Sequence, residues 1–275
     1  VTAKSGYEVM NMNLGAMTST FGSAPDVKPY GLLYQWGRKD PFPSAPSLTG
    51  NEKTQPVPVY GPDGAEVKIT YSLWSSVENN TIEYSIANPT KCLSNYAQYN
   101  TSRDWLKASD SNDALWGNPK GDERNSDNNY VNKGSKSFYD PCPVGYRVPP
   151  ADVFRTFTTT GGYTQDPSSF DVVDLNGDGV IDTRDYNYGW SFNMKEGSLF
   201  FPAAARYDGS YAMLMGSKSG LWGSYWGNSP AKSYGATTGF GFCVLAFMNE
   251  AAGTSVSATA SAGRADAYSV RCVKE

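Results

Sequence analysis

The chain has 275 residues, a formal net charge of −4, 14% aromatic and 18% charged residues, and no histidine. This acidic balance, with no run of Lys or Arg, argues against nucleic-acid binding, because that function needs a clustered basic surface. The lack of histidine excludes His-based acid–base catalysis, Ser-His-Asp and Cys-His nucleophiles, and His-ligated zinc or iron.

The four cysteines bear on where the protein works. They stand at positions 92, 142, 243 and 272 and form no C-x-x-C pair, so we expect neither a zinc site nor a thioredoxin-type site. An even number of cysteines in a chain rich in Gly, Tyr and Asn is typical of exported proteins with disulfides. Three pairings are possible, and buried free thiols are the alternative. No run approaches the roughly 20 apolar residues of a membrane span, and no signal peptide is present, so we expect a mature or excised part of an exported protein.

The first elements along the chain are short. Residues 9–16 indicate a strand that runs into a turn. Residues 30–42 are apolar and then abruptly charged, which indicates a buried segment that reaches the surface. We expect the charges in this segment, at Arg38, Lys39 and Asp40, to form a structural ion pair rather than a functional site.

Long loops and one helix are predicted next. Residues 43–72 are rich in Pro, Gly and polar residues, and residues 108–136 carry almost no apolar residue. The second stretch indicates a long surface loop that Trp116 holds against the protein. Residues 149–157 indicate the start of a helix, because two prolines precede apolar residues with i, i+4 spacing.

The second half of the chain is predicted to be rich in strands. Short apolar runs, separated by Gly-rich turns, occupy residues 199–201, 211–214, 224–226, 240–247 and 268–273. Long helical periodicity is absent, and no repeat or linker marks a second domain. The sequence therefore predicts one domain over residues 1–275 of the α+β class, with one or two helices, a twisted antiparallel sheet and long inserted loops.

Residues 174–185 read D-L-N-G-D-G-V-I-D-T-R-D, which is the spacing of an EF-hand or dockerin-type calcium loop. Oxygens at its first, third and fifth positions converge in a tight turn, for which Gly179 supplies the bend. The last position holds Asp where an EF-hand has Glu, and a surface turn without an ion is the alternative. We expect a structural Ca²⁺ ion, with the ligands Asp174, Asn176, Asp178, the Val180 carbonyl, Asp182 and Asp185.

Six blocks, in the same order, resemble those of the FISUMP (major paralogous) domains of secreted bacterial proteins. Residues 10–16 resemble the opening W-M-D-R-N-L-G-A, and residues 31–42, GLLYQWGRKDPF, match the next block. Residues 140–149, 201–206 and 223–229 resemble D-P-C-P-x-G-[YW]-R-x-P, F-P-A-A-G-x-R and G-x-Y-W-S-S-T. Residues 268–273, YSVRCV, complete the set, so the resemblance covers nearly the whole chain.

The resemblance implies a C-type-lectin-like fold with a disulfide between Cys142 and Cys272. In Bacteroidales, such domains often form the C-terminal part of type V pilus tip adhesins and other surface lipoproteins. The resemblance therefore implies an extracellular location at the cell surface, without direct insertion into the membrane. The implied partners are pilus subunits or other domains of the parent adhesin. Some relatives are variable proteins of diversity-generating retroelements, and residues 221–268 lie where such a protein would be diversified.

The implied function is the non-enzymatic binding of a host or microbial surface protein or glycan through a face built by residues 207–268. Trp226 is expected to belong to the framework core of this face rather than to its surface. A structural module that caps a pilus is the alternative. The candidate ligand-binding residues are Tyr207, Trp222, Ser224, Tyr225, Asn228, Lys232, Tyr234, Phe240, Phe242, Asn249, Arg264 and Asp266.

An enzymatic role is not expected. No motif singles out a pair of carboxylates of the kind that glycosidases use. The closely spaced cysteines of formylglycine-generating enzymes, which share the fold, are not evident. The E-P-N or Q-P-D loop of sugar-binding C-type lectins is also missing, so we do not expect a Ca²⁺ ion that is shared with a sugar.

Overall fold

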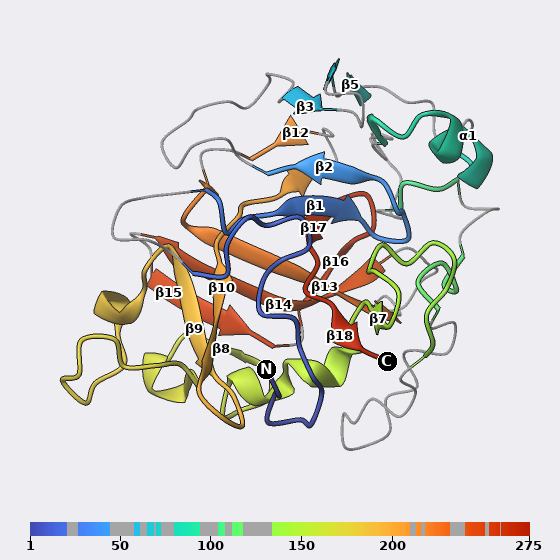
Figure 1. Cartoon of the computed structure of the whole chain (residues 1–275). Coiled ribbons are helices and arrows are strands. Elements are labelled where there is room, and N and C mark those ends of the chain that lie inside the picture. The colour runs from blue at the N-terminus through green and yellow to red at the C-terminus, as the bar shows by residue number, and fades with distance from the viewer. Residues whose placement is uncertain are drawn as a thin grey trace.

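The computed structural model describes residues 1–20, 27–44, 58–60, 65–68, 70–72, 80–93, 104–107, 112–117, 134–209, 213–215, 218–231, 240–250, 253–258 and 260–275. In these residues the protein is mostly β-sheet with a few short helices (Figure 1). This agrees at a coarse level with the predicted class of strands with one or two helices.

Among the described residues, ten strands form one large sheet (Figure 1). The main path runs β12-β11-β17-β13-β14-β15-β8, while β1 pairs with β17 and β2, and β16 pairs with β14. The neighbours are antiparallel except for β13 and β17, which meet in parallel. The strands are β1 (Leu32–Gln35), β2 (Pro41–Pro43), β8 (Tyr163–Thr164), β11 (Tyr207–Asp208), β12 (Met213–Leu214), β13 (Trp222–Ala231), β14 (Phe240–Glu250), β15 (Gly253–Ser257), β16 (Ser261–Gly263) and β17 (Ala267–Ser269).

The other described strands form two-stranded sheets. Three of these pairs are antiparallel, and β5 with β6 is parallel. The pairs are β3 (Pro58–Tyr60) with β4 (Glu66–Lys68), β5 (Thr70–Ser72) with β6 (Lys91–Leu93), β7 (Tyr146–Arg147) with β18 (Val273–Lys274), and β9 (Gly189–Asn193) with β10 (Ser198–Pro202).

The described helices are short. The α-helix α1 (Ile82–Ala87) begins at Thr81, whose hydroxyl accepts a hydrogen bond from the Tyr84 N–H and so caps the first turn. The other described helices are four 3₁₀ segments: η3 (Ala151–Val153), η4 (Arg155–Phe157), η5 (Pro167–Ser169) and η6 (Thr183–Asp185). No helix in the described part of the chain has the length and apolar character needed to cross a membrane.

The helix predicted from residue 149 is replaced by two separate 3₁₀ turns. Val153 N–H donates to the Pro150 carbonyl, and Phe157 N–H donates to the Phe154 carbonyl, both over three residues. Val153 and Phe157 are fully buried, so the apolar spacing identified the buried side but not the helix type. Each turn is only three residues long, in keeping with the usual length of 3₁₀ segments.

The first and last segments of the chain lie side by side, and both termini lie in the lower part of Figure 1. Val9 forms an isolated bridge with Val273, and Met10 N–H donates to the Cys272 carbonyl. The predicted strand over residues 9–16 is therefore limited to a bridge before the turn. At that turn Gly15 has a φ of +79°, and a Cβ there would lie 2.5 Å from the Leu32 side chain, so glycine suits the position on both counts.

A disulfide joins Cys142 to Cys272, the pair that the resemblance implies, with Cα atoms 5.9 Å apart. It links residues 130 positions apart, and a loop of that length lowers the entropy of the unfolded chain by an amount worth about 5 kcal/mol. Cys92 is a free, buried thiol, and burial raises its pKa to about 12. The side chain of Cys243 lies outside the described residues.

Aromatic side chains make up much of the core. One cluster centres on the stacked rings of Phe157 and Phe192, whose centroids are 4.2 Å apart. A second gathers Trp36, Trp116 and Trp226. Trp226 is fully buried, which confirms its predicted place in the framework core. A third, smaller cluster includes Tyr30, Leu33, Phe42 and Tyr207.

The predicted ion pair is also confirmed. The Arg38 guanidinium is buried and its Nη2 lies 3.0 Å from the Asp40 carboxylate. Trp116 is fully buried as well. It holds residues 112–117, the described part of the predicted long loop, against the protein.

Candidate functional site

The register of three strands places a set of side chains on one face of the large sheet. In β13 and β14, Trp222 pairs with Met248 and Ser224 pairs with Ala246. In β14 and β15, Ala246 then pairs with Ser257, and Met248 with Ser255. Because side chains alternate along a strand, these six residues share a face.

The opposite face of the same strands packs into the core. Tyr225, Phe247 and Val256 are buried there in the phenylalanine-rich cluster. Gly223, which pairs with Phe247, leaves room for its ring, because a Cβ at this position would lie 2.2 Å from the ring. The sheet under the candidate site is thus held from behind by close packing.

A groove of about 310 Å³ lies on the outer face. This volume is at the lower end of the range for sites that hold small ligands. Ser224, Ser255 and Ser257 contribute hydroxyls that have no hydrogen-bond partner among the described residues. The full lining is Tyr163, Arg206, Trp222, Ser224, Ala246, Phe247, Met248, Ser255, Ser257 and Ala260.

Trp222 is in contact with two cationic side chains. The Arg206 guanidinium carbon is 5.0 Å from the centroid of its ring and the Lys218 ammonium is 4.6 Å from it. Lys218 also pairs with Glu250. Cations over the face of an indole are attracted by its π electrons, so these contacts hold the ring in place.

A buried network fixes Arg206 in turn. Its Nη1 donates to the Tyr268 hydroxyl at 3.3 Å, and that hydroxyl donates to Asp266 at 2.6 Å. The other oxygen of Asp266 accepts from the Gly209 N–H at 2.6 Å. Burial raises the pKa of the Asp266 carboxyl, although Arg206 and these hydrogen bonds act in the opposite direction. Asp266, predicted to bind a ligand, therefore supports Arg206 from behind the groove.

Two of the predicted ligand-binding residues, Trp222 and Ser224, line the groove. Four others must be corrected, because they are only 0–1% exposed and do not line the groove. The Tyr207 hydroxyl donates to the Pro43 carbonyl at 3.0 Å, and that of Tyr225 donates to the Pro202 carbonyl at 2.7 Å. The four buried residues are Tyr207, Tyr225, Asn228 and Arg264.

The remaining predicted residues fall elsewhere. Asn249 is partly exposed but follows Met248 by one position, so it does not share the face of the groove. Lys232 and Tyr234, and the side chains of Phe240 and Phe242, lie outside the described residues.

The sequence prediction missed several lining residues. Arg206 was placed in a framework block, and Ser255 and Ser257 were not singled out. The alternation of residues 255–258, S-V-S-A, is a period-2 strand signal that places Ser255 and Ser257 on one face of a strand. Tyr163, 59% exposed, reaches the groove from β8. No local sequence pattern indicates that β8 pairs with β15.

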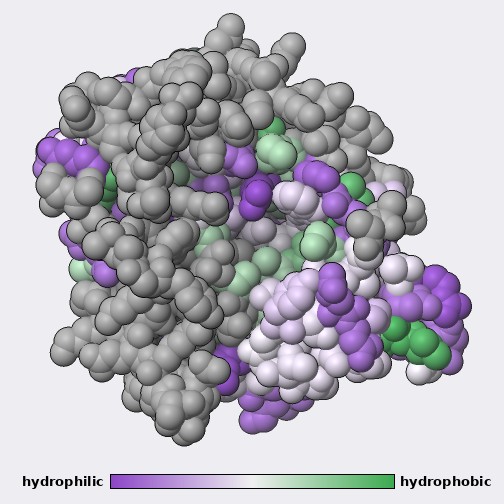
Figure 2. All heavy atoms as spheres, turned by 180° about the vertical axis from the view of Figure 1, so that it is seen from behind, coloured by the Kyte–Doolittle hydropathy of each residue, from purple (hydrophilic) through white to green (hydrophobic). Residues whose placement is uncertain are grey.

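The face behind the view of Figure 1 shows its described residues as a mixture of hydrophilic, near-neutral and hydrophobic groups (Figure 2). The hydrophobic ones visible on it stand in small groups, so the described residues form no broad hydrophobic surface on this face.

The predicted calcium loop is a compact turn closed by its own acidic residues. The two oxygens of Asp174 accept from the Gly177 and Gly179 N–H groups, each at 2.7 Å. Asp185 is buried and accepts from the N–H groups of Leu175, Asn176 and Asp182. The backbone hydrogen bond from Gly179 lowers the pKa of Asp174.

A cation of the protein already contacts two of the predicted ligands. The Arg184 Nη2 lies 2.7 Å from Asp178 and 2.6 Å from Asp182. In the described part of the chain, no three side chains of Cys, Asp or Glu are grouped closely enough to hold a metal ion. The calcium ligands therefore stay a prediction.

No family model, curated protein or solved structure matches this chain. The six sequence blocks remain a resemblance.

Proposed function

We propose that the chain is a non-enzymatic ligand-binding module of the C-type-lectin-like kind, displayed on a bacterial surface as part of an adhesin at a pilus tip or on a lipoprotein. It binds a host or microbial surface protein or glycan in the groove over β13, β14 and β15. The observation that carries the proposal is the set of three serine hydroxyls beside Trp222, without hydrogen-bond partners among the described residues, on one face of a sheet packed from behind.

Three properties of the groove support binding. Trp222 and Tyr163 offer large flat surfaces with little conformational freedom, as aromatic anchors of binding sites do. The serines supply both donors and acceptors, which suits the hydroxyls of a sugar or the backbone of a peptide. The cations that contact Trp222 fix its ring before a ligand arrives, so less entropy is lost on binding.

The chemistry of the lining supports a non-enzymatic role. A serine nucleophile needs an adjacent general base. The described residues that line the groove contain no carboxylate, and the chain has no histidine. A binding role asks only for shape and hydrogen bonding from these side chains.

Export and surface display are supported by the disulfide and by the resemblance. A bond between cysteines 130 residues apart suits an oxidising compartment. The spacing of Asp174, Asn176 and Asp178 supports a structural Ca²⁺ ion in residues 174–185, with Asp185 as a further ligand, and the resemblance adds the adhesin context. It also adds diversification of residues 221–268, which sequences of this segment from related strains would test.

A structural module that caps a pilus is the second candidate. The burial of Tyr207, Tyr225, Asn228 and Arg264 favours it, because aromatic and polar groups expected on a binding face serve the core instead. In that case the groove would have no ligand, and removal of the domain would alter pilus length.

The test is binding of the purified chain to an array of glycans and surface proteins, in calcium and again in EDTA. We expect a selective ligand whose binding falls at least about fivefold in Trp222→Ala, the effect of losing a binding anchor, and is partly kept in Trp222→Phe. Val144→Ala is the control, because Val144 is 96% exposed and lies outside the groove. Unchanged binding by Trp222→Ala would exclude the groove as the site. If the array showed no ligand either in calcium or in EDTA, that result would favour the module that caps a pilus.

A further inference from the structure

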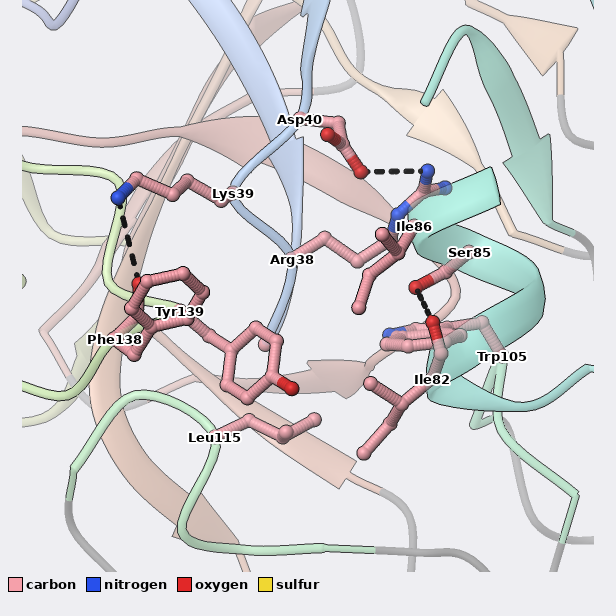
Figure 3. Close-up of a pocket in the computed structure, with 11 residues that line it drawn as sticks. Arg38, Lys39, Asp40, Ile82, Ser85, Ile86, Trp105, Leu115, Phe138 and Tyr139 are labelled. Atoms are coloured by element: carbon pink, nitrogen blue, oxygen red, sulfur yellow. Dashed lines mark hydrogen bonds and ion pairs between the residues drawn. The ribbon is translucent and has the colours of Figure 1, made fainter. Parts of the chain in front are cut away.

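A second pocket, of about 190 Å³, shares no residue with the groove. It lies between α1, the turn that joins β1 to β2, and the segments around Trp105, Leu115 and Phe138 (Figure 3). In Figure 3, Ile82 and Ile86 of α1 face Phe138 and Tyr139 across the opening, and Leu115 lies below.

The rim of this pocket exposes apolar side chains that the fold does not bury. Phe138 is 80% exposed and Ile86 is 58% exposed. Large side chains left this open next to a concave surface are a common feature of protein interaction sites. Trp105 and Leu115, both buried, form the inner wall.

Most polar groups of the pocket are already paired. The Arg38 guanidinium is bound by Asp40, by Gln35 and by the Lys91 carbonyl. The Trp105 N–H donates to the Trp36 carbonyl at 2.7 Å. Arg38 and Asp40 neutralise each other, so the charge that remains among the lining residues is that of Lys39.

Two polar groups retain the capacity to bind. Lys39 is exposed, its ammonium has one acceptor, the Phe138 carbonyl at 3.4 Å, and it pairs with no carboxylate in the described part of the chain. The ammonium also lies 5.1 Å from the centroid of the Phe138 ring. Among the described residues, the Tyr139 hydroxyl has no hydrogen-bond partner either, and an aromatic hydroxyl points into the opening in Figure 3.

We propose that this pocket is a docking site for a partner protein, which inserts one bulky apolar side chain between Ile86 and Phe138 and presents a neighbouring carboxylate to Lys39. The volume of about 190 Å³ decides between a small molecule and a side chain, because sites for drug-sized ligands measure about 300–1,000 Å³. A single anchor side chain in a small apolar pocket is the usual centre of a protein interface. The Lys39 ammonium, which pairs with no carboxylate among the described residues, selects an acidic neighbour by charge complementarity.

The sequence offers a simple readout. The isoleucines are Ile69, Ile82, Ile86 and Ile181, so isotope labelling of the isoleucine δ1 methyl groups gives four NMR signals. Ile82 and Ile86 line the pocket, whereas Ile181 lies in the predicted calcium loop and packs against a different core cluster. The probes are three blocked tetrapeptides: N-acetyl-Gly-Asp-Phe-Gly-amide, the same peptide with Lys for Asp, and the same peptide with Ala for Phe.

We expect the Asp-Phe peptide to shift the signals of Ile82 and Ile86 and to leave that of Ile181 unchanged. The Lys-Phe peptide is expected to bind about fivefold more weakly or worse, and the Asp-Ala peptide to cause no shift. Phe138→Ala is expected to weaken binding of the Asp-Phe peptide by about fivefold or more. Lys39→Glu should reverse the preference between the first two peptides. Val144→Ala, also exposed but outside the pocket, should bind as the unaltered chain does.

Several results would overturn the proposal. The first is no shift with any peptide at millimolar concentration, and the second is equal binding of the Asp-Phe and Lys-Phe peptides. A third is unchanged binding by Phe138→Ala. Shifts of Ile82 and Ile86 that arise when the protein alone is concentrated would identify a second copy of this chain as the occupant instead. Because the groove residues take no part, failure here leaves the proposed function of the groove untouched.

Discussion

At the scale of single residues, four buried tryptophans, Trp36, Trp105, Trp116 and Trp226, donate their indole N–H groups to backbone carbonyls. Trp226 donates to the Tyr34 carbonyl at 2.6 Å, and Trp36 donates to the Gly227 carbonyl at 3.0 Å. Each of these two bonds crosses more than 190 positions in the chain. Trp222 differs, because it is partly exposed and its N–H has no partner among the described residues. Two tryptophans four positions apart thus have different roles.

Replacement of these two residues by alanine should separate stability from binding. Trp226→Ala is expected to lower the free energy of unfolding by about 3–5 kcal/mol, because it leaves a large cavity in the core. Trp222→Ala is expected to cost about 1 kcal/mol, the usual size for a mutation that leaves the core intact. Urea unfolding measures both values. Equal losses in the two variants would contradict the assignment of Trp222 to the groove rather than to the core.

At the scale of elements, residues 174–185 show how a short loop can satisfy its own charges. Asp174 and Asp185 close the turn through backbone N–H groups, and Arg184 pairs with Asp178 and Asp182. The Arg184 guanidinium lowers the pKa of Asp182, which keeps this carboxylate ionised, as a calcium ligand must be. A calcium ion would have to displace the guanidinium from two of its predicted ligands.

Calorimetry should therefore detect calcium binding that depends on both kinds of residue. We expect heat on titration with calcium, no heat in Asp174→Ala, and several-fold tighter binding in Arg184→Ala, because the competing cation is removed. The δ1 methyl signal of Ile181 should shift with calcium, while those of Ile82 and Ile86 stay fixed. Absence of heat in both the unaltered chain and Arg184→Ala would show that the loop is a turn without an ion.

At the scale of the whole molecule, buried tyrosines tie stability to pH. Burial raises the pKa of Tyr30 from 10.0 to about 12, and raises those of Tyr34 and Tyr225 further. Ionisation is therefore favoured in the unfolded chain before it is favoured in the folded one. The resulting stability is complete below the unfolded pKa of about 10 and is lost as the pH rises through the folded pKa values.

We expect the free energy of unfolding to be nearly constant from neutral pH to about pH 9 and to fall steadily above it, because the buried Cys92 thiol and then the buried tyrosines ionise more readily in the unfolded chain. The buried tyrosines Tyr30, Tyr34 and Tyr225 should ionise only together with unfolding. Ultraviolet absorbance of tyrosinate and circular dichroism, followed along one alkaline titration, measure the two events. Ionisation of all tyrosines before any loss of circular dichroism would disprove the coupling.

Local signals predicted a substantial part of the fold. The apolar runs at residues 199–201, 224–226 and 240–247 coincide with β10, β13 and β14, because β-branched and aromatic side chains favour a pleated, half-buried surface. Residues 268–273 are an exception in detail. Residues 270–272 separate β17 from β18, and the two strands belong to different sheets, which no local pattern reveals.

The candidate site was less accessible to prediction. Tyr225 and Trp222 have similar side chains, and their burial depends on which face of β13 meets the core. That choice follows from the packing of Tyr225 against Phe201 of β10 and of Phe247 against Phe192 of β9, contacts that no local pattern reveals. The second pocket is harder still, because Lys39, Ile86 and Phe138 come from three separate segments.

The sequence by itself determined the exclusion of histidine chemistry, the scarcity of long helices, the strand-rich second half and the pairing of Arg38 with Asp40. These depend on composition or on neighbours within a few positions. Only the tertiary structure decided which aromatic residues line a surface and which fill the core, and it brought Arg206 and Tyr163 to the groove. The physical reason is that burial is a property of non-local contacts: Arg271 bonds to Asn13 across 258 positions, and such pairs leave no periodic trace in the sequence.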